Sequence, residues 1–168
     1  MPYYPDKAGH LILLDMVNDL RSANYQPGQL VFGQPESTVA HGRNTVVAVN
    51  PPQGQGFLLH YNRLWLEQLF GVRNLQIPDN GYQSIFALLG VLNGVYQDTM
   101  FTASDFVDTP ISQSSYPKTV TLIASNNSYL VAGSCTIQLT GQNSLLQILT
   151  EDGLPILTQE DTPIILEE

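Results

Sequence analysis

The sequence predicts an α+β fold in which antiparallel β-hairpins pack against a central helix, with another helix near the N-terminus. Two segments place apolar residues at the three- and four-residue spacing of an amphipathic helix. Two other regions pair short β-branched runs across turn-forming residues. The 168 residues are the size of one domain. We expect a compact domain over residues 1–147, with an extended N-terminal lead, and a β-forming arm over residues 148–168.

The first helix is expected from Leu11 to Asn24, and Pro27-Gly28 stops it. Its apolar positions are Leu13, Leu14, Val17 and Leu20. Gln29 to Phe32 follows as a candidate short strand, and Gly33 to Gly42 is expected to be a loop.

The first hairpin is expected to join a strand at Thr45 to Val49 with a strand at Gly56 to Tyr61. The first of these runs is β-branched, and a loop rich in Pro, Gln and Gly separates the two. This arrangement predicts an antiparallel pair.

The central segment changes to helical periodicity. Asn62 is a candidate N-cap for a short helix over Arg63 to Phe70. Asn80 opens a second helix that extends to Tyr96, with Gln83 at the capping-box position. Together they are expected to form the scaffold core, and its members are Trp65, Leu66, Leu69, Ile85, Phe86, Leu89, Leu92 and Tyr96.

Gly90 and Gly94 lie four residues apart on the second helix, a spacing that favours close packing against another element. A membrane dimer motif has the same spacing. Asn93 and Gln97 interrupt the apolar run, so packing is the better interpretation.

A second hairpin is expected after a connector at Thr102 to Pro117. Its strands are Thr119 to Ala124 and Tyr129 to Leu139, and the residues between them are strong turn formers.

The C-terminal arm contains an eight-residue repeat, ILTEDGLP followed by ILTQEDTP and a truncated IILEE. Charge runs are usually solvated, so an acidic tail exposed to solvent is one interpretation. The apolar pairs favour another, in which the arm adds strands to a neighbouring sheet. The interacting residues would be Ile148, Leu149, Ile156, Leu157, Ile164 and Ile165.

The composition restricts the partners of the chain. Only 12% of the residues are charged and the net charge is −9, and this low content of charge is typical of surfaces that contact other proteins. Nucleic-acid binding requires clustered cations, whereas Arg21, Arg43, Arg63 and Arg73 are scattered. No apolar run is long enough to span a membrane, and the N-terminus lacks the layout of a signal peptide.

Catalytic and metal-binding patterns are weak, and we predict a protein that is not an enzyme and needs no cofactor. His10, His41 and His60 are far apart and form no zinc motif, and His60 is expected to be half-buried or on the surface. Cys135 is expected to be a small buried residue rather than a nucleophile.

Three aspartates are close together in the sequence, at Asp98, Asp105 and Asp108, but they lack the spacing of a calcium loop. Asp105 is interpreted as a loop or capping residue. The eight tyrosines and Trp65 could form a sugar-binding surface, although core and interface packing is the better interpretation.

Several segments resemble a family of virion proteins from large contractile-tailed bacteriophages. The resemblance rests on GRNTVVAV at residues 42–49, LLHYNRLWLEQLFG at 58–71, GYQSIFALLGVLNGVY at 81–96 and SYLVAGSCTIQL at 128–139. It covers roughly residues 11–140. It implies a structural component of the virion and transfers no active-site residues.

The resulting expectation is a virion structural protein, in a tail or baseplate rather than a head, assembled in the host cytoplasm. Its partners would be other virion proteins and copies of itself, with neither nucleic acid nor membrane. One alternative is a receptor- or glycan-binding module of a fibre or baseplate, which predicts exposed aromatic side chains near Trp65 or in the loops. Another is a small hydrolase, which requires titratable residues that converge in one cleft.

Overall fold

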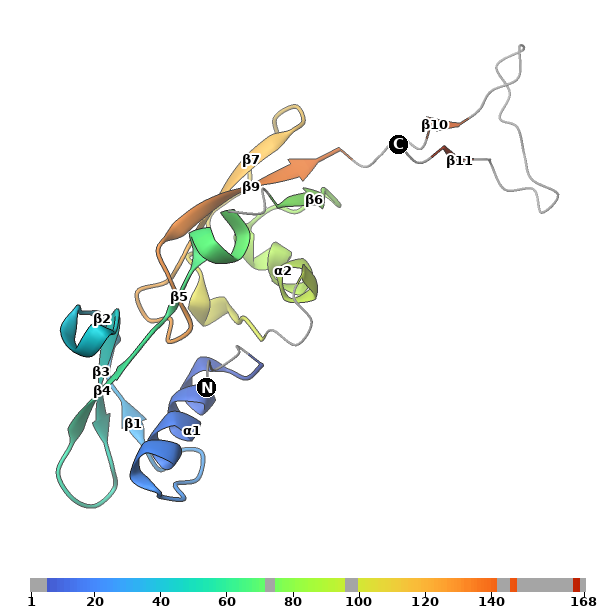
Figure 1. Ribbon diagram of the computed structural model, residues 1–168. Coiled ribbons are helices and arrows are strands. Elements are labelled where there is room, and N and C mark those ends of the chain that lie inside the picture. Colours follow the sequence, from blue (N-terminus) through green and yellow to red (C-terminus); the bar gives the residue numbers. More distant parts are fainter. Residues whose placement is uncertain (1–5, 72–74, 96–99, 142–145, 148–164, 167–168) are drawn as a thin grey trace, which may run out of the picture.

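The computed structural model describes residues 6–71, 75–95, 100–141, 146–147 and 165–166. It confirms an α+β fold with antiparallel pairs and an N-terminal helix. Figure 1 shows an elongated body with one sheet and helix α1 at one end, and the other sheet and helix α2 at the other. A continuous hydrophobic core joins the two ends.

Helix α1 (Gly9–Arg21) ends three residues earlier than expected, because the Asn18 side chain forms hydrogen bonds with the backbone that follows the helix. The Asn18 side chain accepts a hydrogen bond from Tyr25 N at 2.8 Å and donates one to Tyr25 O at 3.0 Å. Ser22 takes a left-handed conformation that turns the chain back. Leu20, expected on the buried side, is 72% exposed.

The first sheet is built around β3 (Thr45–Asn50). The expected hairpin partner β4 (Phe57–Tyr61) pairs with it antiparallel. On the other edge of β3 lie β1 (Val31–Phe32) and β2 (Glu36–Ser37). The predicted loop at Gly33 to Gly42 therefore contains a strand, and also a 3₁₀ turn at Ala40–Gly42.

The second sheet places β9 (Ser134–Thr140) between β7 (Lys118–Ile123) and β6 (Gln76–Pro78). The antiparallel β7–β9 pair is the predicted second hairpin, whereas β6 joins β9 in parallel. Gly133, at φ +79°, separates β9 from β8 (Val131–Ala132), so the single strand predicted from Tyr129 to Leu139 is two strands.

The short helix predicted over Arg63 to Phe70 is confirmed in its second half and wrong in its first. Leu64 and Trp65 form β5, parallel to β8, and the backbone N–H of Leu64 donates to Leu130 O at 2.9 Å. A π-helix follows at Glu67–Gly71. Asn62 is no helix cap, and its side chain accepts a hydrogen bond from Asn44 N.

The second helix begins later than expected, with a 3₁₀ turn at Ile85–Leu88 that leads into α2 (Leu89–Val95). Asp79 shapes the preceding turn by accepting hydrogen bonds from Gly81 N and Tyr82 N. The amide of Gln83 donates to Gly81 O rather than forming a capping box. A short 3₁₀ helix at Ala103–Asp105 follows.

The expected scaffold core is partly corrected. Leu66, Ile85 and Leu92 are fully buried, and Leu69 and Leu89 pack against the core while partly exposed. Trp65 is 44% exposed, on the opposite side of β5 from the partly buried Leu64, whereas Leu66, directly after the strand, is fully buried. Phe86 is 38% exposed beside the buried Ile85. Tyr96 lies outside the described residues.

Gly90 and Gly94 do not make the close contacts that their spacing predicted. A Cβ atom at either glycine would have no neighbour within 4 Å in the described part of the chain.

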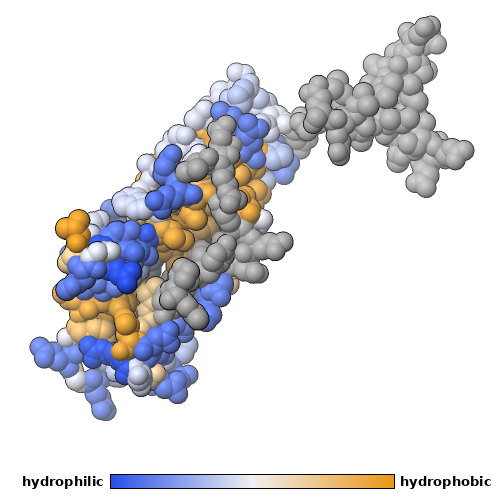
Figure 2. All heavy atoms as spheres, viewed as in Figure 1, coloured by the Kyte–Doolittle hydropathy of each residue, from blue (hydrophilic) through white to orange (hydrophobic). Residues whose placement is uncertain are grey.

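Figure 2 shows hydrophobic side chains reaching the surface along the body.

The arm is described only at its end. β10 (Leu146–Gln147) pairs antiparallel with β11 (Ile165–Leu166). The other predicted arm residues, Ile148, Leu149, Ile156, Leu157 and Ile164, lie outside the described residues.

Candidate functional site

The outward side of the second sheet carries a regular array of uncharged side chains. Strand alternation turns Val120, Leu122, Ile137 and Leu139 into the core. The intervening residues point the other way. We call them the polar face: Gln76, Thr119, Thr121, Ile123, Ser134, Thr136 and Gln138.

The strand register places these side chains in rows. Thr121 lies opposite Thr136, Ile123 opposite Ser134, and Thr119 opposite Gln138, which also pairs with Gln76. Hydroxyl and amide groups can each donate and accept hydrogen bonds. The polar face can therefore bind another surface without burying a charge.

One end of the polar face is apolar. Ile123 lies beside Val107, whose backbone N–H donates to Ile123 O at 2.9 Å, and both side chains are exposed. The Trp65 ring covers Gly133, where a Cβ atom would lie 2.9 Å from the ring. An exposed tryptophan thus lies next to the strand that carries Ser134.

A buried ion pair between Asp79 and Lys118 lies within the same sheet. Asp79 follows β6 and Lys118 opens β7, so the pair joins the two strands that flank β9. Lys118 Nζ donates to Asp79 Oδ2 at 2.6 Å, with side chains 5% and 0% exposed.

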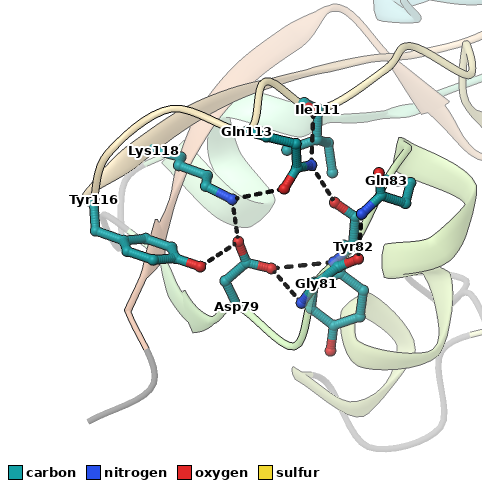
Figure 3. A network of polar contacts seen from close by, with 8 residues as sticks. All are labelled: Asp79, Gly81, Tyr82, Gln83, Ile111, Gln113, Tyr116 and Lys118. Carbon is teal, nitrogen blue, oxygen red and sulfur yellow. Dashed lines mark hydrogen bonds and ion pairs between the residues drawn. The ribbon is translucent and has the colours of Figure 1, made fainter. Parts of the chain in front are cut away.

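Neutral groups complete this network (Figure 3). Tyr116 Oη donates to Asp79 Oδ2 at 3.0 Å. Lys118 Nζ also donates to Gln113 Oε1 at 3.3 Å, and the amide of Gln113 donates to the carbonyl oxygens of Ile111 and Tyr82. The side chains of Tyr116, Lys118 and Gln113 therefore connect the turn after β6 to the segment that leads into β7.

The electrostatics of the pair favour the charged form of both partners. The hydrogen bond from Lys118, with those from Gly81, Tyr116 and Tyr82, lowers the pKa of Asp79 to about 2 despite its burial. The Asp79 carboxylate raises the pKa of Lys118. Since a general acid or base needs a pKa near the working pH, the pair is suited to holding the sheet together rather than to proton transfer.

A second network ties the first sheet to the loop before β8. Arg63 Nε donates to Thr45 Oγ1 at 3.0 Å, and its Nη1 donates to Ser128 O at 3.2 Å. The Ser128 hydroxyl donates to Asp105 Oδ1 at 2.7 Å. Burial lowers the pKa of Arg63. These contacts connect β3 of the first sheet to the loop that follows β7.

The structure brings together two of the three histidines. The rings of His41 and His60 meet edge to face with centroids 4.7 Å apart, although the sequence gives no signal for this contact. His60 is half-buried, and in the described structure its Nδ1 has no hydrogen-bond partner. His10 is exposed on α1. Among the described residues no three His, Cys, Asp or Glu side chains form a metal-binding group.

The other candidates occupy separate places. Cys135 is buried, and burial raises the pKa of its thiol to about 11. Asp105 is buried and forms a capping box with Thr102, which confirms its interpretation as a capping residue. Asp108 accepts a hydrogen bond from Phe86 N. Asp98 lies outside the described residues.

The sequence interpretation missed Asp79, Lys118, Tyr116 and Arg63. The segment Pro78-Asp79-Asn80-Gly81 is a turn signature that could have located Asp79. Nothing local marks Lys118 as buried, since lysine is almost never fully buried unless paired.

Among the described residues, no helix has the length and apolar character required to cross a bilayer. The model of one protein family, described as a family of unknown function (DUF7941), matches residues 1–164. No curated protein and no solved structure matches the chain.

Proposed function

The chain belongs to the DUF7941 family of unknown function, and from its geometry we propose that it is a non-catalytic assembly subunit. It acts through contacts with other proteins and with copies of itself. The proposed setting is the virion of a contractile-tailed phage, in its tail or baseplate rather than its head. This setting is supported by the sequence resemblance alone.

The observation that carries the proposal is the polar face. Its seven side chains bear no charge, and charged residues are depleted in the cores of protein interfaces. The hydroxyls of Thr121 and Thr136 lie in register across β7 and β9, so a partner meets a regular set of hydrogen-bonding groups. The Asp79–Lys118 pair behind this surface holds the three strands in that register.

The polar face can be tested by placing a charge at its centre. Thr121→Arg should leave the fold intact, because the side chain is exposed, and should weaken association with the partner by burying an unpaired cation. Gln53→Arg is the matched control, since it adds the same charge in the exposed loop before β4.

The measurement is incorporation of the tagged variants into purified phage particles, quantified by mass spectrometry. Reduced incorporation of Thr121→Arg with normal incorporation of Gln53→Arg supports the proposal. Equal incorporation of both variants means that the polar face is not the interface. Absence of the unmodified chain from purified particles means that the virion setting is wrong.

A glycan-binding module is the second candidate, favoured by the exposure of Trp65. Its ring lies over Gly133 near the exposed Ile123, and exposed aromatic rings can stack on the apolar side of a sugar. A glycan array should then show binding that Trp65→Ala removes and Phe86→Ala, at another exposed aromatic position, does not. Absence of binding by the unmodified chain would count against this candidate.

A further inference from the structure

We propose that the open edge of β4 is the acceptor for the acidic arm, residues 148–168, of a second copy of this chain, which adds to the first sheet as a strand. This inference rests on the proposed assembly function and names one contact through which assembly occurs. Four features carry it: the free backbone groups of β4, its apolar side, two exposed cations and the position of the arm.

Two residues of β4 present their backbone groups to the open edge. In the described structure β4 pairs with β3 alone. Ala48 accepts a hydrogen bond from Gly33 N at 2.8 Å, so the polar backbone groups of Ala48 face away from β4. Leu58 lies opposite Ala48 on β4, and the two form a non-hydrogen-bonded antiparallel pair. In such a pair the N–H and C=O of each residue point away from the partner strand, so those of Leu58 point away from β3. His60, two residues further along β4, directs its backbone N–H and C=O to the open edge in the same way.

The outward side of the first sheet is apolar where Leu58 lies. Leu58 is 63% exposed, and its cross-strand partner Ala48 is also exposed. Val31, at the end of β1, is another exposed apolar residue. Figure 2 shows hydrophobic side chains at the surface in the part of the molecule where Figure 1 places β3 and β4. An added strand would cover this surface with its own apolar side chains.

Charge complementarity indicates the occupant. Residues 148–168 include six Asp or Glu and no Lys or Arg. Arg21 places its guanidinium 3.5 Å from the centre of the Phe57 ring at the start of β4. Arg43 is exposed just before Thr45, which pairs with the last residue of β4, Tyr61. The edge therefore has an exposed cation near each end.

The other described cations are already engaged. Lys7 pairs with Asp15, Lys118 with Asp79, and Arg63 bonds to Thr45 and Ser128. In the described part of the chain, Arg21 and Arg43 are the arginines placed to meet an acidic strand at β4. The arm also contains the β-prone Ile-Leu-Thr run twice, each time followed by acidic residues. Each run can add to the edge of a sheet as a strand.

The position of the arm favours a second copy over the same molecule. Figure 1 places β10 and β11 at the opposite end of the molecule from β4. In the sequence, these two paired strands flank residues 148–164. A contact between one end of a molecule and the other end of the next is heterologous, so it generates rings or filaments.

The edge is tested in the full-length chain with three variants at one position. Leu58→Pro removes the outward N–H without removing a β3–β4 hydrogen bond, and proline is tolerated on edge strands. Leu58→Ala keeps the N–H, and Leu58→Glu adds a charge that repels the arm. Because a hydrogen bond contributes about 1 kcal/mol and 1.4 kcal/mol is tenfold, Leu58→Pro and Leu58→Glu should weaken self-association several-fold.

Sedimentation equilibrium measures the self-association, with circular dichroism to verify folding of each variant. Leu58→Ala should associate more tightly than either of the other two variants, and added salt should weaken association of the unmodified chain. Equal association by all four folded proteins overturns the proposal, as does an unmodified chain that stays monomeric at all concentrations. Should Leu58→Pro not fold, the comparison of Leu58→Glu with Leu58→Ala decides.

The occupant is identified by cross-linking. L58K places an amine at the edge, and a carbodiimide joins amines to nearby carboxylates. In a mixture of ¹⁴N- and ¹⁵N-labelled L58K, peptides that join the new amine to an arm carboxylate of the other isotope support the proposal. Links within one isotope only would place the arm in its own molecule. Links to residues outside 148–168, or none, would exclude the arm as the occupant.

This result is independent of the virion setting. If mixed-isotope links form but the chain is absent from purified particles, the edge contact is supported and the virion setting is rejected. If the Leu58→Glu variant is incorporated normally into particles, the assembly function is supported and the contact at the β4 edge is rejected.

Discussion

Asp79, directly after β6, accepts hydrogen bonds from Lys118, Tyr116, Gly81 and Tyr82 on its carboxylate. Removing one partner of a buried pair leaves the other charge unpaired, which is strongly destabilising. Asp79→Asn should therefore lower the melting temperature much more than Asp15→Asn, which interrupts the exposed pair with Lys7. Equal melting temperatures for the two variants at neutral pH would contradict this account of the pair.

The pH dependence of stability follows from the same carboxylate. The pKa of Asp79 falls from 3.8 to about 2 on folding, so the ionised form stabilises the native state above about pH 4. As the pH falls from about 4 to about 2 the unfolded state takes up this proton before the native state does, so the contribution is lost. The difference in unfolding free energy between the unmodified chain and Asp79→Asn should shrink across this range, as urea titrations can measure.

The limits of sequence interpretation at this scale are clear in two residues. Trp65 is predicted in the core because aromatic residues at helical spacing usually pack there. In the structure it lies on β5 instead, and that strand pairs with Val131 and Ala132 far along the chain. Lys118 is buried in the structure. Its burial depends on Asp79, a partner 39 positions away in the sequence, so no local pattern reveals it.

At the scale of elements, the glycines of α2 give a direct test of the packing. Gly90 lies in a helix, and no atom of the described residues lies within 4 Å of a Cβ atom built there. Glycine is less favourable than alanine in a helix by roughly 0.5–1 kcal/mol. Gly90→Ala should therefore stabilise the protein by about that amount in chemical denaturation. A loss of stability would mean that another surface packs closely on α2, as the four-residue spacing first indicated.

Local signals predicted some elements well and others poorly. The β3–β4 and β7–β9 pairs were predicted because each joins neighbouring β-prone runs. The parallel pairs were not, since β5 meets β8 and β6 meets β9 across more than 60 residues. The polar face was likewise not foreseen, although the alternation within β7 is visible in the sequence. Its position beside β9 and β6 depends on the long-range pairs.

At the scale of the whole molecule, the arm and the body are expected to be separable. The described core contains no residue beyond Leu139. Deleting residues 148–168 should therefore change the melting temperature little while it reduces self-association and incorporation into particles. Differential scanning calorimetry and sedimentation equilibrium measure the two effects. Unfolding of the truncated chain would contradict the separation, and its normal incorporation would contradict a role of the arm in assembly.

The central position of β9 also determines the order in which the protein can fold during synthesis. The hairpin of β3 and β4 is complete once Tyr61 has left the ribosome. Within the described structure β6 and β7 pair only with β9, and β5 only with β8. β5 is therefore unpaired until Ala132 has emerged, and the pairing of β6 and β7 is complete only when Thr140 has emerged. Until then the nascent chain exposes Ile77, Val120 and Leu122, which are buried in the finished protein. Exposed apolar strands of this kind promote aggregation, so slow translation or a bound chaperone between β7 and β9 should affect the yield of folded protein more than any delay before residue 61.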